Sequence, residues 1–62
     1  MNKIFLQLGS NMGDRCENLL QATRLISEEI GSVISISNIY ESTPWGVDNQ
    51  RNFLNHSVLI QL

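Results

Sequence analysis

The sequence has little charge of either sign and very few basic residues. Of its 62 residues, four are Lys or Arg and six are Asp or Glu, which leaves a net charge of −2. The basic residues Lys3, Arg15, Arg24 and Arg51 are never neighbours, whereas a protein that binds DNA or RNA needs clustered cations along the phosphate backbone. We therefore expect no nucleic-acid partner.

Long apolar runs and paired cysteines are also missing. No segment approaches the roughly 20 apolar residues of a membrane-spanning helix, and Gln7 interrupts the apolar run near the start, so no signal peptide is recognised. Cys16 is the single cysteine, and one cysteine with one histidine makes neither a disulfide nor a metal site. These features predict a cytoplasmic chain with no membrane partner, in which Cys16 is a small helix residue.

A chain of this length forms at most one small domain, which we assign to residues 1–62. Such a domain buries only about 60% of the surface that its unfolded chain exposes. The hydrophobic content of 42% allows folding, but with marginal stability. A second copy of the chain or further polypeptide is expected to add the missing contacts.

Four segments show clear periodicity. Residues 4–8 form a short apolar run that predicts a buried strand. Asp14 and Glu17 form an approximate capping box at the start of a helix, which Gly31 can end in a left-handed conformation. Hydrophobic residues at three- and four-residue spacing give this helix one apolar stripe: Leu19, Ala22, Ile26 and Ile30, widened by Leu20 and Leu25.

The remaining two segments alternate with period two, as half-buried strands do. Residues 33–40 form the first of them. Its two sides are Ile34, Ile36 and Tyr40 against Ser35 and Ser37. Residues 53–62 form the second. Its two sides are Leu54, Val58, Ile60 and Leu62 against Phe53, Asn55, Ser57, Leu59 and Gln61.

The order β-α-β-β predicts an α+β fold. A strand, a crossover helix and a second strand favour a right-handed parallel unit. The third strand can then lie between the first two and pair antiparallel with both, which is the first half of a ferredoxin-like split βαβ sandwich. The first strand would remain an open edge, where another chain could pair.

Residues 41–52 form a twelve-residue connection, whereas a hairpin usually needs two to five residues, so a functional loop is favoured. Trp45 lies in it between Pro44 and Gly46. Its indole offers a flat face on which a heterocycle can stack. The alternative is that Trp45 folds back over the sheet.

Asn55 lies within an otherwise regular strand, where asparagine is disfavoured. Its carboxamide can meet a ring edge that shows a donor beside an acceptor, such as an aminopyrimidinone. Phe53 lies on the same face and could pack beside such a ring. A solvated strand asparagine is the alternative. His56 points to the opposite face and is interpreted as a structural histidine.

Residues 9–13 join the first strand to the helix. Glycines there allow a ligand to approach the backbone, and the helix N-terminus attracts anions. Asp14 would repel a phosphate, however, and no Gly-Lys-Ser/Thr follows. A tight turn that walls a ligand site is therefore favoured over a phosphate-binding loop. No arrangement of residues suggests catalytic or metal-binding side chains.

These segments together resemble the N-terminal part of the 6-hydroxymethyl-7,8-dihydropterin pyrophosphokinase family. Three blocks in the right order carry the resemblance, which covers essentially the whole chain: Leu8-Gly9-Ser10-Asn11-Met12-Gly13-Asp14-Arg15 with Asn18-Leu19, then Tyr40-Glu41-Ser42-Thr43-Pro44-Trp45-Gly46, then Gln50 with Phe53-Leu54-Asn55. The resemblance implies diphosphate transfer from ATP to the pterin's hydroxymethyl oxygen, with two magnesium ions, in folate biosynthesis.

The resemblance also implies a pterin-binding site. Gly9 would lie close to the ring, and backbone groups around Ser42, Thr43 and Trp45 would bond its edge. Phe53 would pack against the ring, and Asn55 would hydrogen-bond its pyrimidinone side. Ser42 stands where many members have threonine, which is a mild change if the backbone forms the bonds. Phe53 replaces a tyrosine of some members and keeps the ring.

Other parts of the family's site lie further along than Leu62: an Asp-x-Asp pair that binds magnesium, an Arg- and His-rich segment that holds ATP, and a second aromatic wall. The resemblance therefore implies a truncated N-terminal portion with no cofactor of its own, inactive alone and carrying the pterin-binding half. The alternative is a non-catalytic binding or assembly module that forms an oligomer through its open sheet edge. A further possibility is that another polypeptide supplies the C-terminal half.

Overall fold

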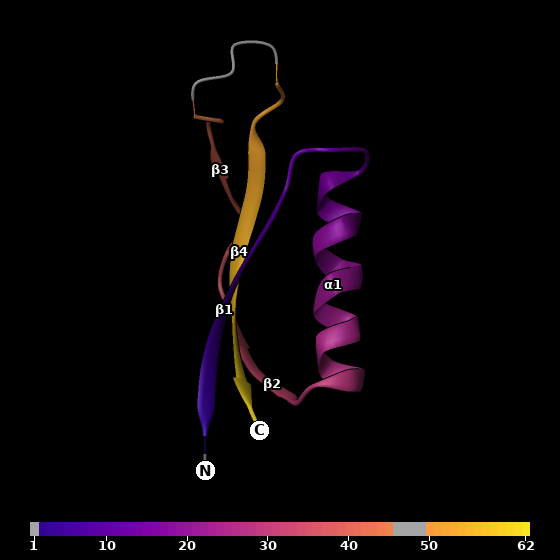
Figure 1. The fold of residues 1–62 in the computed structure, drawn as a ribbon, viewed down its shortest axis with the longest axis vertical. Helices are drawn as coiled ribbons and strands as arrows, with labels where there is room; N and C mark the ends of the chain where they lie inside the picture. Colours follow the sequence, from indigo (N-terminus) through magenta and orange to yellow (C-terminus); the bar gives the residue numbers. More distant parts are fainter. Residues whose placement is uncertain (1, 46–49) are drawn as a thin grey trace.

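A computed structural model describes residues 2–45 and 50–62 of the chain. One helix lies along one face of a twisted antiparallel sheet, and no described element covers the other face (Figure 1). The elements in chain order are β1 (Lys3–Ser10), α1 (Arg15–Glu29), β2 (Ser32–Ile36), β3 (Tyr40–Ser42) and β4 (Phe53–Gln61).

The strand that comes last among the described elements, β4, is central in the sheet. β1 and β2 pair with it antiparallel on either side, and the short β3 also pairs with it antiparallel. This confirms the α+β fold of the ferredoxin-like class and the insertion of the third predicted strand between the first two. β1 is longer than predicted because its pairing continues to Gly9 opposite Asn55 and Ser10 opposite Leu54.

The prediction of one continuous strand over residues 33–40 is wrong. β2 ends at Ile36, β3 begins at Tyr40, and the register shifts between Val33 and Ser35. Ile36 lies opposite Val58, while Tyr40 lies opposite Asn55. Since Asn55 and Val58 are three residues apart on one strand, Ile36 and Tyr40 face opposite sides of the sheet.

A serine side chain explains how the sheet continues across this break. The Ser57 backbone N–H donates to Ser37 Oγ at 2.8 Å, and the Ser37 N–H donates to the Ser57 carbonyl at 2.9 Å. A hydroxyl thus replaces a backbone carbonyl in the ladder, as serine readily does. The predicted loop over 41–52 consequently begins later, because Glu41 and Ser42 belong to β3.

The helix begins as predicted but ends for another reason. Asp14 Oδ1 accepts from the Glu17 backbone N–H at 3.0 Å, so Asp14 is the N-cap. The predicted left-handed conformation of Gly31 is wrong, because Gly13 is the described glycine with a positive φ, 59°. A Cβ on Gly31 would instead lie 2.6 Å from the Gln61 carbonyl oxygen. Glycine is needed there for close approach of two backbone segments.

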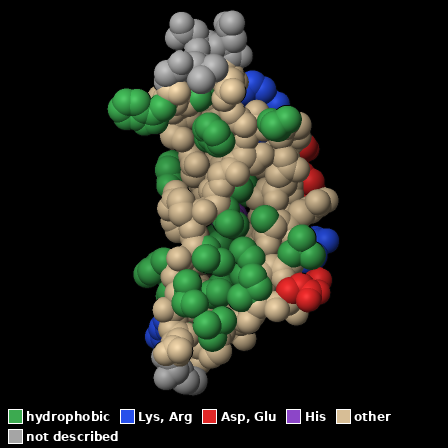
Figure 2. All heavy atoms as spheres, in the orientation of Figure 1, with side chains coloured by type: hydrophobic (Ala, Val, Ile, Leu, Met, Phe, Trp, Pro, Cys, Tyr) green, Lys and Arg blue, Asp and Glu red, His purple; other side chains and the backbone are tan. Residues whose placement is uncertain are grey.

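The core lies between α1 and β4 and is small. Its buried hydrophobic side chains are Leu19, Ile26, Val58 and Ile60. Leu6, Leu8 and Val33 pack against the last three of these. Ile30, the last residue of the predicted stripe, is exposed, as are Leu20 and Leu25. Hydrophobic side chains gather at the surface between the sheet and the helix (Figure 2).

The molecule is elongated, with extents of 43 × 18 × 16 Å. Its accessible surface is 4588 Å², whereas a compact monomer of this mass exposes about 4,000 Å². Its radius of gyration is 12.8 Å, against about 10.6 Å for a compact chain of this length. The fold therefore exposes about 500 Å² more than a compact domain of the same size.

α1 is not long and apolar enough to cross a membrane, and residues 2–45 and 50–62 contain no other helix.

Candidate functional site

The face of the sheet that α1 leaves open carries most of the predicted site residues. Asn55 on β4 lies between Gly9 on β1 and Tyr40 on β3, and Phe53 lies opposite Ser42. Side chains of residues directly opposite each other in a sheet share a face. The register therefore brings together four predicted residues from three strands: Gly9, Ser42, Phe53 and Asn55.

Gly9 provides the space that the Asn55 side chain occupies. A Cβ on Gly9 would lie 2.9 Å from Asn55 Oδ1 and 3.6 Å from Phe53 Cδ1. The first of these distances is shorter than ordinary contacts allow. The carboxamide and the Phe53 ring thus both lie over the bare backbone of Gly9, which explains glycine at this position without any special backbone angle.

The carboxamide nitrogen of Asn55 is bound within the chain. Asn55 Nδ2 donates to Ser42 Oγ at 2.9 Å and to the Tyr40 carbonyl oxygen at 3.3 Å. Both contacts come from β3, the strand that sequence patterning did not separate from β2. An amide nitrogen has two hydrogens, so both are used. The Asn55 oxygen has no hydrogen-bond partner among the described residues, so the carboxamide leaves an acceptor for a ligand in place of the donor–acceptor pair expected from the sequence.

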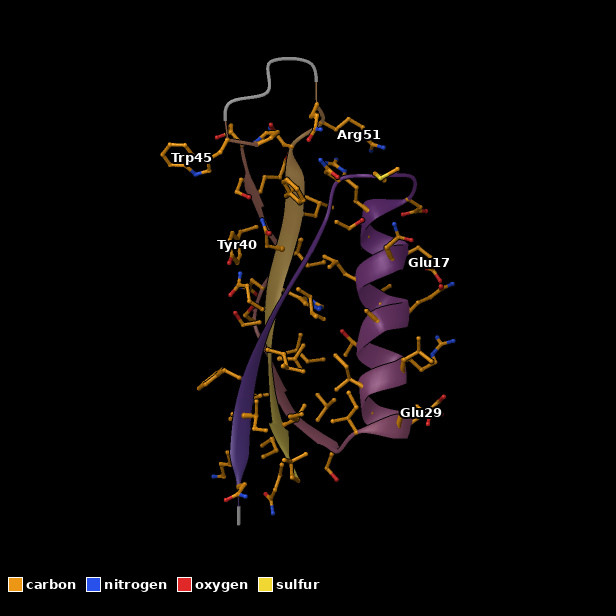
Figure 3. All side chains as sticks on the ribbon, viewed as in Figure 1. Glu17, Glu29, Tyr40, Trp45 and Arg51 are labelled. Carbon is orange, nitrogen blue, oxygen red and sulfur yellow. The ribbon has the colours of Figure 1, made fainter. Side chains whose placement is uncertain are left out.

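Trp45 does not join the other site residues. Its side chain is 98% exposed and points away from the sheet (Figure 3), so the alternative in which it folds back over the sheet is wrong. Thr43 follows β3 directly and is also exposed. Residues 46–49, which complete the predicted loop, lie outside the described residues.

A further polar group lies on the same open face and was not predicted from the sequence. Gln7 Nε2 donates to the Tyr40 hydroxyl, and Ser57 Oγ donates to Gln7 Oε1 at 3.0 Å. Gln7 lies opposite Ser57, two positions from Gly9. The signal was present in the sequence, because a polar Gln7 in an apolar strand and the alternation of Ser57 with His56 and Val58 both mark this face.

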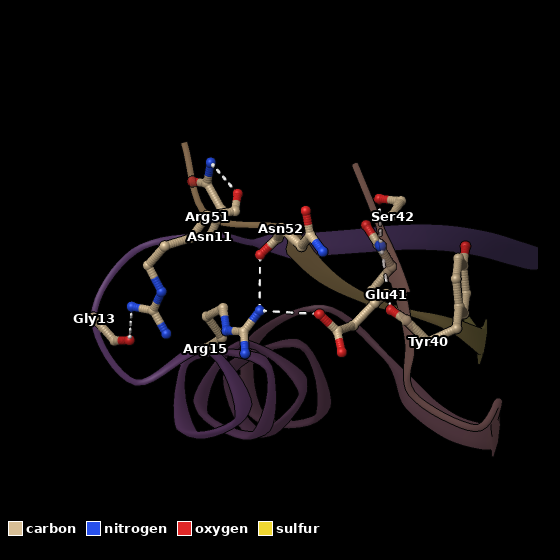
Figure 4. A network of polar contacts seen from close by, with 9 residues as sticks. Asn11, Gly13, Arg15, Tyr40, Glu41, Ser42, Arg51 and Asn52 are labelled. Atoms are coloured by element: carbon tan, nitrogen blue, oxygen red, sulfur yellow. Dashed lines mark hydrogen bonds and ion pairs between the residues drawn. The ribbon is translucent and has the colours of Figure 1, made fainter. Parts of the chain in front are cut away.

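A second polar cluster joins the β1–α1 turn to the segment before β4, and we call it the loop clamp: Asn11, Gly13, Arg15, Glu41, Gln50, Arg51 and Asn52. All of these except Gln50 are labelled in Figure 4. Arg51 Nη1 donates to the Gly13 carbonyl at 2.8 Å, and Arg15 Nη1 donates to the Asn52 carbonyl at 2.8 Å. Arg15 also pairs with Glu41 at 3.5 Å. Each guanidinium thus bonds a backbone carbonyl across the two segments.

Two asparagines complete this region. Asn11 Nδ2 donates to Gln50 Oε1 at 3.2 Å and lies 3.5 Å from the Arg51 carbonyl oxygen. Asn18 Nδ2 donates to Ser10 Oγ at 3.0 Å and to the Met12 carbonyl at 2.8 Å. The residues between Gly9 and Gly13 therefore form a turn tied to α1, whose N-terminus the Asp14 carboxylate already caps. This arrangement favours the tight turn over a phosphate-binding loop.

His56 lies on the helix-facing side of β4, as expected, and is 2% exposed. Its Nε2 lies 3.0 Å from Thr23 Oγ1, whose own hydrogen goes to the Leu19 carbonyl at 2.8 Å. The Thr23 oxygen must then accept from a protonated Nε2. His56 is therefore a core residue with its polar atom bonded to α1.

Residues 2–45 and 50–62 contain no group of three or more His, Cys, Asp or Glu side chains that could hold a metal ion. Cys16 is exposed on α1. The described donor set does not fit a magnesium site, so we derive no step through a metal for these residues.

Comparison with known protein families shows to which family the chain belongs. Residues 5–62 match the model of the family described as 7,8-dihydro-6-hydroxymethylpterin-pyrophosphokinase (HPPK). The chain belongs to this family. The resemblance noted in the three sequence blocks is thereby confirmed.

Three curated relatives are each named 2-amino-4-hydroxy-6-hydroxymethyldihydropteridine pyrophosphokinase. The Aquifex aeolicus protein is 47% identical over 55 residues, which is 89% of this chain and 34% of the relative. The Bacillus subtilis protein is 43% identical over 63 residues, covering 98% of this chain and 38% of the relative. The Porphyromonas gingivalis protein is 36% identical over 58 residues, covering 94% and 40%. The chain thus spans between a third and two fifths of the length of these relatives.

Proposed function

We propose that this chain supplies the pterin-binding half of a 2-amino-4-hydroxy-6-hydroxymethyldihydropteridine pyrophosphokinase of folate biosynthesis. The observation that carries the proposal is the meeting of Gly9, Ser42, Phe53 and Asn55 on the open face of the sheet. Family membership over residues 5–62 supports it. The proposed compartment is the cytoplasm, which a single free cysteine, Cys16, favours.

The geometry suggests how the pterin would bind. The Phe53 ring beside Gly9 would form one wall of the site, and an aromatic ring offset against a flat heterocycle is a favourable contact. Asn55 Oδ1 would accept a hydrogen bond from the pyrimidinone edge. Backbone groups around Ser42, Thr43 and Trp45 would bond the rest of that edge.

In the proposed reaction, the hydroxymethyl oxygen of the bound pterin attacks ATP and receives its terminal diphosphate. Phosphoryl-group transfer depends mainly on positioning and on neutralising charge with metal ions and cations. We assign no catalytic side chain and no magnesium ligand to residues 1–62, and we propose that the 62-residue chain binds pterin without transferring diphosphate. Pterin-dependent consumption of ATP by the purified chain would contradict this.

The decisive experiment is a titration of the chain with 6-hydroxymethylpterin, followed by Trp45 fluorescence and by amide NMR shifts. Binding should weaken by about 1–3 kcal/mol in Asn55→Ala, the scale for a lost buried polar partner. The matched control is Asn38→Ala, which removes an exposed asparagine outside the strands. No response at millimolar ligand, or equal effects of the two substitutions, would contradict the proposal.

A second candidate function is an assembly module, and the open edge of β1 favours it. Among the described strands, β1 pairs only with β4, so the other edge of its eight residues offers free backbone groups. The excess exposed surface, about 500 Å² over a compact monomer, approaches the roughly 800 Å² per partner of a standard interface. The partner would be a second copy or a polypeptide that supplies a C-terminal half.

Sedimentation of the purified chain, together with the pterin titration, distinguishes the pterin-binding half from the assembly module. A 7.0 kDa monomer at all concentrations would rule out self-association. Association without pterin affinity would favour the assembly module over the pterin-binding half. Activity that appears only on mixing with a second polypeptide would support a site divided between two chains.

A further inference from the structure

We infer that the Ser42 side chain is a positioning residue that fixes the Asn55 carboxamide and thereby selects which heterocycle edge can bind. This inference rests on the proposed pterin site and deepens it. It assigns a role to the hydroxyl of Ser42 itself, where the family resemblance required only backbone groups. The ligand class it specifies is a cyclic amide that shows an N–H donor beside an acceptor.

The contacts of Asn55 determine the orientation of its side-chain amide. The Tyr40 carbonyl oxygen can only accept a hydrogen bond, so the amide atom that lies 3.3 Å from it must be nitrogen. The same nitrogen lies 2.9 Å from Ser42 Oγ. The Ser42 hydroxyl therefore acts as an acceptor towards Asn55. Of the two bonds that hold the amide, the one to Ser42 is the shorter.

Two atoms of the Asn55–Ser42 pair remain for a ligand. Asn55 Oδ1 is directed to the bare backbone of Gly9, where a Cβ would be only 2.9 Å away. No described residue donates to this oxygen. The Ser42 hydroxyl accepts from the Asn55 nitrogen, and no described residue accepts its hydrogen. An acceptor, the Asn55 oxygen, and a donor, the Ser42 hydroxyl bonded to the same carboxamide, thus remain available on the open face.

The Asn55 oxygen and the Ser42 hydroxyl together fit one class of ligand. An acceptor beside a donor is complementary to a lactam, in which a ring N–H is adjacent to a carbonyl oxygen. The Asn55 oxygen would accept from the ring N–H, and the Ser42 hydroxyl would donate to the carbonyl. A ring whose nitrogen carries a methyl group in place of hydrogen would leave Asn55 Oδ1 without a partner, and such a loss discriminates strongly between ligands.

Removing the Ser42 hydroxyl should loosen the amide. In Ser42→Ala, Asn55 keeps only its longer contact with the Tyr40 carbonyl, so its side chain samples other rotamers. The expected loss in affinity for 6-hydroxymethylpterin is roughly tenfold, the scale of one hydrogen bond. Ser42→Thr keeps the hydroxyl and should bind within about twofold of the unchanged chain.

The selectivity between two ligands tests this inference more sharply than the affinity for one of them. The ratio of affinities for 6-hydroxymethylpterin and for its derivative methylated on the lactam nitrogen should be large in the unchanged chain and in Ser42→Thr. It should shrink severalfold in Ser42→Ala, because a mobile amide no longer holds its oxygen at the N–H. If Ser42 only stabilised β3, Ser42→Ala would lower the affinities for both ligands by the same factor. That result would overturn the inference.

A measurement on the chain without ligand separates this inference from the proposed function. The side-chain amide resonances of Asn55 in a ¹⁵N-labelled chain should shift in Ser42→Ala and stay in place in Ser42→Thr. Glu41→Ala is the matched control, because Glu41 lies in the same strand opposite Leu54 rather than Phe53 or Asn55. If Asn55 resonances respond while no pterin binds, the proposed function fails and the positioning role stands. Unchanged Asn55 resonances in Ser42→Ala would overturn the inference.

Discussion

The two faces of β4 differ in composition and in what they contact. Towards α1 the strand presents His56, Val58 and Ile60, all buried. Towards the open side it presents Phe53, Asn55 and Ser57, which are half-buried, and its polar side chains bond to β1 and β3. One nine-residue strand therefore contributes both the core and the candidate site.

This division shows how a very small domain can separate stability from binding. Alternate residues of a strand point to opposite faces, so substitutions one position apart should have different consequences. A shift of one residue in the register of β4 would exchange its helix-facing residues with its open-face residues completely. Four predictions test this separation, from the largest expected effect to the smallest.

The helix-facing side should determine stability. Ile60→Ala removes a side chain that is 1% exposed, and such a truncation costs about 2–5 kcal/mol. A 62-residue domain has roughly 3–9 kcal/mol in total, so the variant should lose about half of its stability, measured as a lower urea midpoint by circular dichroism. Leu59→Ala, one position away on the open face, is the control and should retain the fold. Equal losses would contradict the separation.

The hydroxyl of Thr23 should also contribute to stability, through His56. Thr23→Val leaves the buried Nε2 of His56 without its partner at 3.0 Å, which should lower the free energy of unfolding by about 1–3 kcal/mol in urea. Thr23→Ser keeps the hydroxyl and should lose much less. A Val variant as stable as the Ser variant would show that this hydrogen bond does not support the core.

Two glycines should separate binding from stability. In Gly9→Ala the new Cβ meets Asn55 Oδ1, the end of a movable side chain, so the carboxamide turns away. Pterin affinity should fall roughly tenfold while the urea midpoint stays nearly unchanged. In Gly31→Ala the Cβ meets the Gln61 backbone oxygen at 2.6 Å, so this variant should lose stability, by about 1–3 kcal/mol. The opposite pattern would refute the separation.

The loop clamp should have the smallest effect on unfolding. Arg51→Ala removes the hydrogen bond to the Gly13 carbonyl, an exposed contact worth about 0.5–1.5 kcal/mol. The expected result is faster hydrogen exchange in the β1–α1 turn with little change in overall stability. Arg51→Lys can still donate to this carbonyl and should exchange more slowly than the Ala variant. Identical exchange in all three chains would show that the clamp does not order the turn.

The features that the sequence predicted correctly arise from local patterns. The alternation of β4 indicated both of its faces, and Asp14 indicated the start of α1, because each signal lies within a few neighbouring residues. Alternation placed Phe53 and Asn55 on one face of β4, whereas only the family resemblance implied that Gly9 lies beside them, and the register of β1 against β4 brings the three together.

The features that were missed depend on contacts between distant segments. The break between β2 and β3 relies on Ser37 bonding to Ser57, and no local pattern marks a hydroxyl that replaces a backbone carbonyl. The sequence explained Gly31 by a left-handed backbone angle. Glycine is needed there because a side chain would collide with the Gln61 carbonyl oxygen. The donors of Asn55 were expected to be free, but Ser42 and the Tyr40 carbonyl use them.

The central position of β4 also determines the order in which this sheet can form during synthesis. Every strand pairing in the described sheet includes β4, and Lys3 pairs with Gln61, 61 − 3 = 58 positions later. While the ribosome is still producing residues before 53, β1, β2 and β3 have no partner and only α1 can form locally. The sheet can therefore form only after β4 has been synthesised, and its pairings then form together. Pairings of such long range slow folding, and the apolar strand that waits longest, β1, is where a chaperone would be expected to bind the nascent chain.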